Sequence, residues 1–176
     1  MIELIKDKIA GVIVSGKLKS HENILQSFDN IFTKSFTYFI VMPEDESDFN
    51  HSFEVLNFLD SNRKTPIAFT FEYKVSLLPQ KFRARAIGYN LADVSRLKLP
   101  SASLIKKLNA MNYNVVLDLN RTESIFNSYA ANLVKAPVRI GYQKNNSDKY
   151  YNLQFNIDEA SPEISYKKLL NCLQMF

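Results

Sequence analysis

The feature that most constrains the fold is a strand–helix–strand pattern in residues 113–142. An apolar, β-branched run occupies Tyr113–Asn120, and a polar turn follows at Arg121–Glu123. Helical spacing of apolar residues then continues to Ala136, where a second short apolar run begins and extends through Pro137–Tyr142. This order of run, turn, amphipathic segment and run is typical of one βαβ unit, so it predicts two parallel strands joined by a helix.

Strands and helices alternate through the rest of the chain. The unbroken apolar run Thr37–Pro43 predicts a buried central strand, and Pro66–Tyr73 and Ala84–Tyr89 predict two more. Apolar spacing predicts the other helices: residues 2–15, a short one near 23–32, 49–59 with Ser47 or Asp48 at its cap, 101–111 with Ser101 or Ser103 at its cap, and one opened by Ser161–Glu163. Asn120 and Glu123 have the spacing of a capping pair for the βαβ helix.

The strictest alternation of apolar and polar residues lies in Tyr150–Ile157. One polar face indicates an edge strand, and the polar turn Lys144–Lys149 before it suggests a hairpin with an antiparallel partner. The sequence therefore predicts an α/β fold of three layers, Rossmann-like, with a mostly parallel sheet, helices on both faces and an antiparallel edge strand.

Composition is that of a globular protein. At 176 residues, with 46% hydrophobic and 23% charged residues, we expect a single domain, 1–176, in which 1–36 is a helical extension, 37–143 the α/β lobe, and 144–176 the edge strand and last helix. A lone cysteine, Cys172, permits no internal disulfide, and the charged N-terminus resembles neither a signal peptide nor a membrane span. We expect a cytoplasmic protein.

Charge is unevenly distributed along the chain. Residues 37–76 carry seven acidic against three basic side chains, whereas residues 77–121 carry eight basic against two acidic ones. The basic segment 77–121 is either a solvated surface or a contact for an anionic partner. No aromatic-interleaved motif or basic recognition helix accompanies it, so we expect no nucleic-acid binding.

Several kinds of chemistry are disfavoured by residue types. His21, His51 and Cys172 do not have zinc-binding spacing, so no metal site is predicted. The four glycines do not form a phosphate-binding loop, and a serine-nucleophile elbow is missing for the same reason. We expect no cofactor.

Four polar residues follow predicted strands, at the edge where parallel sheets bind ligands. Asp118 ends one strand and is either a ligand-binding carboxylate or a turn cap, and Arg121 just beyond it is either an anion clamp or a solvated arginine. Asp48 and His51, three residues apart, would share a helical face and permit an acid–base pair. A capping Asp48 with an exposed His51 explains the same spacing.

Three stretches together resemble the N-terminal lobe of glycosyltransferase family 9, the heptosyltransferases of lipopolysaccharide core synthesis. They are Phe39–Val41 through Ser47–Ser52, Tyr113–Leu119, which is similar to the family's "YDVVIDLQ" strand, and Ala130–Tyr142, which is similar to its "ARLAGAPRRIGF" helix and strand. The resemblance covers about three fifths of the chain, residues 37–143.

The resemblance implies a GT-B architecture, in which the N-terminal lobe binds the acceptor sugar and a second lobe binds the nucleotide-sugar donor. It places Asp48 on the family's catalytic base, whereas Ser47 replaces the family's glycine and Glu44–Glu46 add negative charge to the loop. The 176 residues hold no counterpart of the donor lobe, so we expect no complete active site in this chain.

Three functional hypotheses follow. The first is a shortened relative of the acceptor lobe, non-catalytic alone, that binds a sugar, a sugar-phosphate or a protein partner. The second is half of a split glycosyltransferase that needs another chain for the donor. The third is a non-enzymatic scaffold or assembly module that docks a partner through the basic segment or an edge strand.

Overall fold

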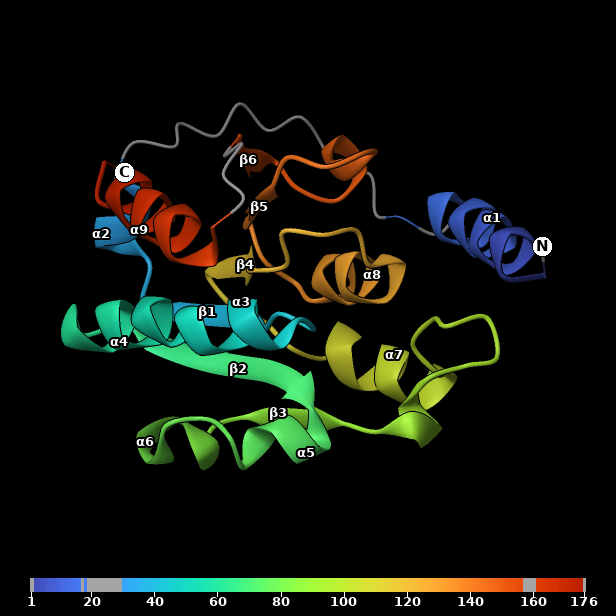
Figure 1. Ribbon diagram of the computed structural model, residues 1–176, viewed down its shortest axis with the longest axis horizontal. Coiled ribbons are helices and arrows are strands. Elements are labelled where there is room, and N and C mark those ends of the chain that lie inside the picture. Colours follow the sequence, from blue (N-terminus) through green and yellow to red (C-terminus); the bar gives the residue numbers. More distant parts are fainter. Residues whose placement is uncertain (1, 17, 19–29, 157–160, 176) are drawn as a thin grey trace.

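The computed structural model describes residues 2–16, 18, 30–156 and 161–175 (Figure 1). Within these residues one sheet has the strand order β3-β2-β1-β4-β5-β6, and every neighbouring pair is parallel. The strands are β1 (Thr37–Val41), β2 (Thr65–Phe71), β3 (Ile87–Tyr89), β4 (Val115–Asp118), β5 (Val138–Tyr142) and β6 (Leu153–Phe155). This is the order of doubly wound Rossmann-like sheets, so the predicted fold class is confirmed.

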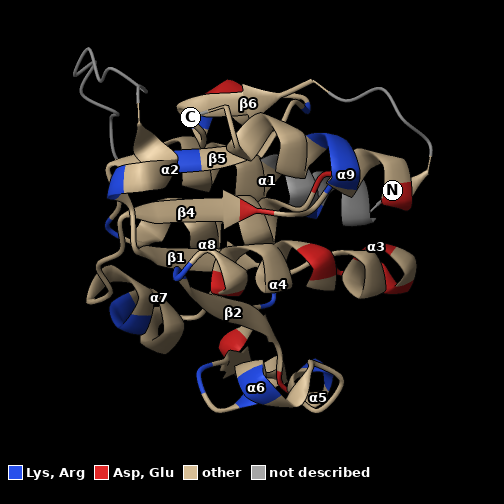
Figure 2. Cartoon of the chain, turned by 90° about the vertical axis from the view of Figure 1, so that its left-hand side faces the viewer, with Lys and Arg blue, Asp and Glu red and all other residues tan. Residues whose placement is uncertain are grey.

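Helices cover both faces of the sheet (Figures 1 and 2). One face packs against α3 (Glu46–His51), α4 (Phe53–Ser61), α6 (Gln80–Arg83) and α9 (Pro162–Leu173), with α2 (Ile31–Lys34) at its margin. The other face packs against α1 (Ile2–Ser15), α7 (Ala102–Asn109) and α8 (Ile125–Leu133). We call these the α9 face and the α8 face. The short helix α5 (Glu72–Val75) lies beside β3.

The central strands are apolar on both sides because both sides are covered. In β1, Tyr38 and Ile40 join the core on the α9 face, and Phe39 and Val41 join the core on the α8 face. The same division holds in β4, where all four residues are buried. Continuous apolar runs, rather than alternating ones, are therefore the correct signal for these strands.

The βαβ unit of β4, α8 and β5 forms where the sequence predicts it. Its helix is capped by Ser124, whose Oγ accepts a hydrogen bond from the Asn127 amide at 3.3 Å, so the predicted capping pair of Asn120 and Glu123 is wrong. At the other end, the buried Arg139 guanidinium of β5 donates to the carbonyls of Val134 at 2.7 Å and Ala136 at 2.9 Å. It thereby satisfies acceptors where α8 ends, at the negative end of the helix dipole.

The predicted helix 49–59 is divided into α3 and α4 at Ser52. The buried Ser52 hydroxyl donates to the Phe49 carbonyl at 2.6 Å, a contact of the kind that bends helices. The cap of α3 is Asp45, which accepts from the Asp48 amide at 2.9 Å, so neither Ser47 nor Asp48 caps it. The predicted helix near 23–32 lies largely outside the described residues.

The predicted antiparallel edge strand is wrong, because β6 lies at the edge but runs parallel to β5. The segment between these strands does not form a hairpin; it crosses the α8 face, where Tyr150 and Tyr151 are buried in the core. The Tyr151 ring lies so close to Gly141 that a Cβ there would approach it to 2.9 Å. Burial of two tyrosines on the way back to the start of β5 outweighs the shorter route of a hairpin.

Candidate functional site

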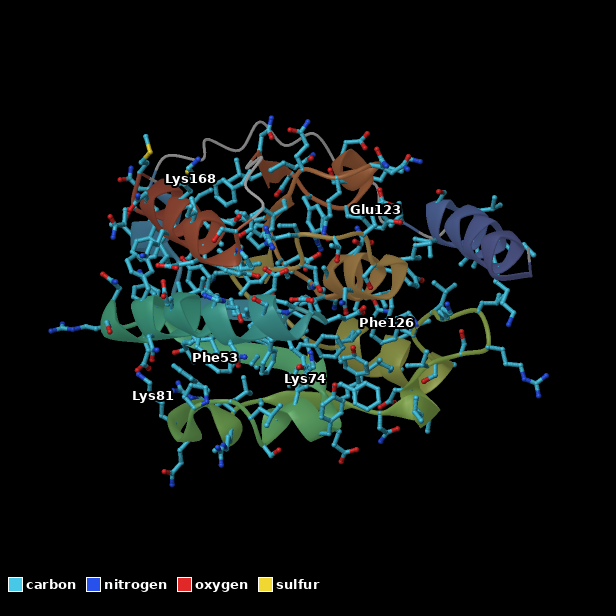
Figure 3. The ribbon with its side chains drawn as sticks, viewed as in Figure 1. Phe53, Lys74, Lys81, Glu123, Phe126 and Lys168 are labelled. Carbon is cyan, nitrogen blue, oxygen red and sulfur yellow. The ribbon has the colours of Figure 1, made fainter. Side chains whose placement is uncertain are left out.

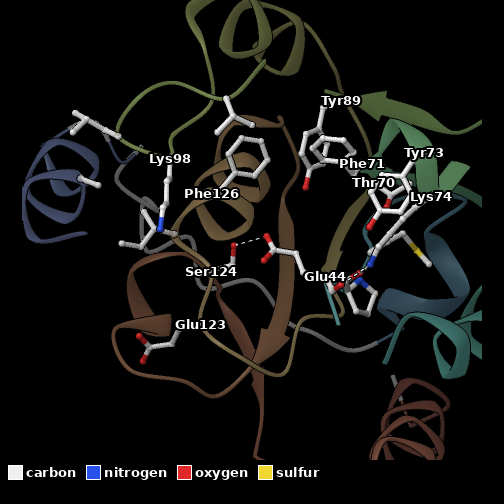
Figure 4. A pocket seen from close by; sticks show the side chains of 16 residues that line it. Glu44, Thr70, Phe71, Tyr73, Lys74, Tyr89, Lys98, Glu123, Ser124 and Phe126 are labelled. Carbon is white, nitrogen blue, oxygen red and sulfur yellow. Dashed lines mark hydrogen bonds between the residues drawn. The ribbon is translucent and has the colours of Figure 1, made fainter. Parts of the chain in front are cut away.

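A cavity of about 680 Å³ opens at the carboxyl ends of β1, β2 and β3, beside the amino end of α8 (Figure 4). It lies next to the gap between β1 and β4, the switch point at which strand order reverses and at which sheets of this kind bind ligands. Its volume suits a small-molecule site. Its lining includes Glu44, Thr70, Phe71, Tyr73, Lys74, Tyr89, Ser124 and Phe126.

Glu44 connects the loop after β1 to α8. Its Oε1 accepts hydrogen bonds from Ser124 Oγ at 3.0 Å and from Asn127 Nδ2 at 2.9 Å. One donor is the cap of α8 and the other lies in its first turn. The Glu44 side chain nevertheless remains exposed to the cavity. A carboxylate therefore lies at the positive end of a helix dipole and remains accessible to a ligand.

Lys74 holds the same loop from the opposite side. Its ammonium donates to the carbonyls of Pro43, at 3.3 Å, and of Glu44, and lies 4.8 Å from the Phe49 ring centre. Burial lowers the pKa of Lys74, and the carboxylates of the loop, Glu46 among them, oppose that shift. Figure 3 shows Lys74 inside the molecule, in contrast to Lys81 at its periphery.

Aromatic rings form a continuous wall of the cavity. Tyr89 packs edge-on against Phe71, with ring centres 5.2 Å apart, and against Phe126 at 4.7 Å. Figure 4 shows the hydroxyl end of Tyr89 directed toward the space that the Glu44 carboxylate enters. Burial raises the pKa of Tyr89, and the negative charge of Glu44 raises it further, so this phenol is a hydrogen-bond donor at neutral pH.

Asn120 holds the switch point together. Its Nδ2 donates to Asp118 Oδ1 at 2.7 Å and to the Met42 carbonyl at 3.3 Å, which joins the ends of β4 and β1. Its Oδ1 accepts from the Glu44 amide at 3.1 Å and from Asn127 Nδ2 at 3.3 Å. The amide group thus fixes the loop that carries Glu44 relative to α8.

Asp48 and Arg121 meet on the α9 face of the switch point. Arg121 Nε donates to Asp48 Oδ1 at 2.6 Å, with only 6% of the Asp48 side chain exposed. Arg121 also donates to Ser165 Oγ of α9 at 3.3 Å. Neither Asp48 nor Arg121 is among the residues that line the cavity. The Tyr142 hydroxyl, buried on the same face, has no hydrogen-bond partner among the described residues.

Asp118 belongs to a different, buried cluster on the α8 face. It accepts hydrogen bonds from the Tyr151 hydroxyl, from Lys144 Nζ at 3.4 Å and from the Asn120 amide at 3.0 Å. Lys144 Nζ donates in addition to the Asn120 carbonyl at 2.7 Å. With 1% of its surface exposed, Asp118 anchors the segment between β5 and β6 and does not reach the cavity.

His51 stands apart from the other predicted site residues. Its Nδ1 lies 2.8 Å from the Ser47 carbonyl within α3, and among the described residues no hydrogen bond or ion pair joins it to Asp48. The four predicted residues are thus divided among an ion pair, a buried cluster and a helix surface. Sequence reasoning missed Glu44, Lys74 and Tyr89 as cavity residues, although Glu44 follows β1 just as Asp118 ends β4.

The acidic and basic segments of the chain meet at one surface. Asp60 of α4 pairs with Lys81 at 2.8 Å and with Arg85 at 3.6 Å, and the hydrogen bond from Lys81 lowers the pKa of Asp60. Figure 2 shows basic residues on α6 and α7 and acidic residues on α3.

Within the described residues, no group of three or more histidine, cysteine or acidic side chains could hold a metal ion. The described helices are all too short or too polar to span a bilayer.

Comparison with known proteins identifies no relative of this chain. No protein-family model matches the chain, and neither a curated protein nor a solved structure matches it. The resemblance to glycosyltransferase family 9 therefore stays a prediction, carried by the residues quoted above.

Proposed function

We propose that the protein binds a sugar or sugar-phosphate in the cavity beside Glu44, as a counterpart of a glycosyltransferase acceptor lobe that is non-catalytic alone. Two observations are compatible with this role. The residues 37–143 that resemble the acceptor lobe fold as a Rossmann-like unit, and the cavity lies at the carboxyl edge of its sheet. Fold alone does not assign a ligand, so the proposal depends on the chemistry of the cavity.

The observation that carries the proposal is an accessible carboxylate next to an aromatic wall. A carboxylate accepts hydrogen bonds from vicinal sugar hydroxyls, while an aromatic ring packs against the C–H face of a pyranose. Glu44 supplies the first group, Tyr89 and Phe126 supply the second, and the Tyr89 hydroxyl adds a donor. These groups lie at or after the carboxyl ends of β1, β3 and β4, so they would contact a bound sugar from more than one side.

Binding is proposed rather than turnover because of the position of Asp48. A general base needs to come within hydrogen-bonding reach of the hydroxyl that it deprotonates. The Asp48 carboxylate is instead buried against Arg121 on the α9 face and does not line the cavity. In the split-enzyme alternative, a partner chain would have to open this ion pair before Asp48 could act.

The test is titration of the isolated protein with a panel of neutral hexoses, heptoses and their phosphates, by calorimetry and by amide NMR shifts. We expect Tyr89→Phe to weaken the binding of the best ligand by roughly tenfold, since one hydrogen bond to ligand is lost. Tyr113→Phe is the matched control, because Tyr113 is a partly buried tyrosine of the α8 face that does not line the cavity. It should leave affinity unchanged.

Three results would contradict the proposal in different ways. Shifts centred away from Glu44 and Phe126 would place the ligand elsewhere. Sugar transfer in the presence of a partner chain, abolished by Asp48→Ala, would favour the split enzyme. Failure of the whole panel to bind, with a protein partner captured instead, would favour the scaffold.

A further inference from the structure

The amino end of α8 has the features of an anion site. The helix has nine residues, its cap Ser124 lines the cavity, and the helix dipole places partial positive charge there. In doubly wound folds this position, beside the switch point, is where phosphate groups bind. A sugar-phosphate would therefore be expected to direct its phosphate at Ser124.

Glu44 already occupies that position. The side-chain donors that the first turn and its cap present, Ser124 Oγ and Asn127 Nδ2, both bond to Glu44 Oε1, at 3.0 and 2.9 Å. The Asn127 amide is directed to Ser124 Oγ at 3.3 Å. A phosphate brought to this helix end would have to displace a carboxylate from its partners or share space with it, and like charges in a partly desolvated site repel.

The nearest buried cation does not compensate. Lys74 directs its ammonium to the backbone carbonyls of Pro43 and Glu44 in the loop, and only 5% of the Lys74 surface is exposed. Lys98 and Glu123 also line the cavity, but as one cation and one anion they add no net charge. The net charge of the exposed side chains that line the cavity is therefore that of one carboxylate, such as Glu44.

We propose that the cavity selects uncharged, hydroxyl-rich ligands and rejects phosphate esters, with Glu44 acting as a built-in anion at the amino end of α8. This inference rests on the proposed sugar binding and narrows it to neutral sugars. It also assigns Glu44 two roles in one position: it accepts hydrogen bonds from sugar hydroxyls, and it closes the helix end to anions.

The experiment compares matched ligands on three proteins: the unchanged chain, Glu44→Gln and Glu46→Gln. Glucose with glucose 6-phosphate, and mannose with mannose 6-phosphate, are titrated by calorimetry, and inorganic phosphate is titrated by the NMR shifts of the Ser124 and Asn127 amides. Glu46→Gln removes the same charge from the neighbouring first turn of α3 without touching α8, because Glu46 does not line the cavity.

For the unchanged chain we expect the neutral sugar to bind at least about fivefold more tightly than its phosphate ester. Glu44→Gln should weaken the sugar and strengthen inorganic phosphate by roughly fivefold or more, while Glu46→Gln should reproduce the unchanged chain. Equal or tighter binding of the phosphate ester by the unchanged chain would overturn the inference and leave sugar binding intact.

The two proposals fail separately. If neither neutral sugars nor their phosphates bind the unchanged chain, the proposed function is wrong, and inorganic phosphate still tests the role of Glu44. Phosphate shifts at Ser124 that are the same in Glu44→Gln and the unchanged chain would then overturn the built-in anion as well. Retained amide spectra of both variants establish that they are folded.

Discussion

The carboxylates on the two sides of the switch point differ in their exposure. On the α9 face, Asp48 and Arg121 are paired at 2.6 Å under α9, and almost nothing of the carboxylate is exposed. Beside the α8 face, Glu44 is bonded to α8 and remains exposed in a cavity. Both arrangements lie at the carboxyl edge of the sheet. Position at that edge therefore does not distinguish a buried ion pair from an accessible carboxylate such as the one we propose as a ligand contact, whereas exposure to the cavity does.

The largest test of this difference is Asp48→Asn. The substitution removes the Asp48 carboxylate from its contact with the mostly buried Arg121 guanidinium, and we expect the free energy of unfolding to fall by about 3 kcal/mol. Urea unfolding measures it. If the residue is structural, sugar affinity should not change; loss of binding at full stability would instead place Asp48 in the site.

Two matched variants sharpen that result. Replacement of both partners, Asp48→Asn with Arg121→Met, should recover part of the stability, because the anion and the cation of the pair are removed together. Glu163→Gln, which breaks the exposed pair with Lys167, should leave the free energy of unfolding nearly unchanged, because solvent screens that pair.

A second test concerns the buried cluster around Asp118. Gly141→Ala would bring a Cβ to within 2.9 Å of the Tyr151 ring, whose hydroxyl holds Asp118. We expect a loss of about 2 kcal/mol in the free energy of unfolding, with the Tyr151 and Lys144 amides shifted in NMR spectra.

Gly11→Ala is the control for this substitution. A Cβ at Gly11, in α1, meets no atom within 4 Å, so alanine should be neutral or should stabilise the helix by about 0.5 kcal/mol. Equal losses at both glycines would show that Tyr151 is not packed against Gly141 as described.

A third test, with the smallest effect expected at neutral pH, concerns the pH dependence of stability that arises from tyrosines on the α9 face. Burial raises the pKa of Tyr38 to about 12, and it raises the pKa values of Tyr142 and Tyr166 as well. These phenols stay protonated in the folded chain while the unfolded chain begins to release protons near pH 10. Their contribution to stability is therefore complete below pH 10 and is lost as pH rises above it, by at most about 1.4 kcal/mol per pH unit for each tyrosine.

Unfolding of the chain at intervals between pH 9 and 11.5 measures this slope. Tyr142→Phe is the informative variant, because the Tyr142 hydroxyl has no partner among the described residues and its loss should cost little at neutral pH. The variant should flatten the alkaline slope. An unchanged slope would mean that Tyr142 titrates normally and is not buried as described.

The layers of the fold could be predicted from sequence because burial on both faces makes β1 and β4 apolar without interruption. The direction of β6 could not be predicted, because it depends on Tyr150 and Tyr151, which pack in the core on the α8 face. Considered locally, a polar turn before an alternating strand indicates a hairpin instead. The break at Ser52 depends likewise on one side-chain hydrogen bond.

The site was harder to predict than the fold. Glu44, Lys74, Tyr89 and Ser124 come from four separate strand exits, so no spacing in the sequence marks them as a group. Asp48 and Arg121 were correctly placed near strand ends, but which face each residue takes, and which partner it meets there, depends on the packing of α9.

Arg139 has a consequence for how such a chain can vary. Its guanidinium extends from β5 to the carbonyls of Val134 and Ala136. The length of the arginine side chain therefore limits how long the connection between α8 and β5 can be. An insertion in that connection would pull the carbonyls out of reach, whatever residues it contained. Variants of this chain should therefore tolerate changes of residue type at the exposed positions Lys135 and Pro137 far better than changes of length between residues 134 and 137.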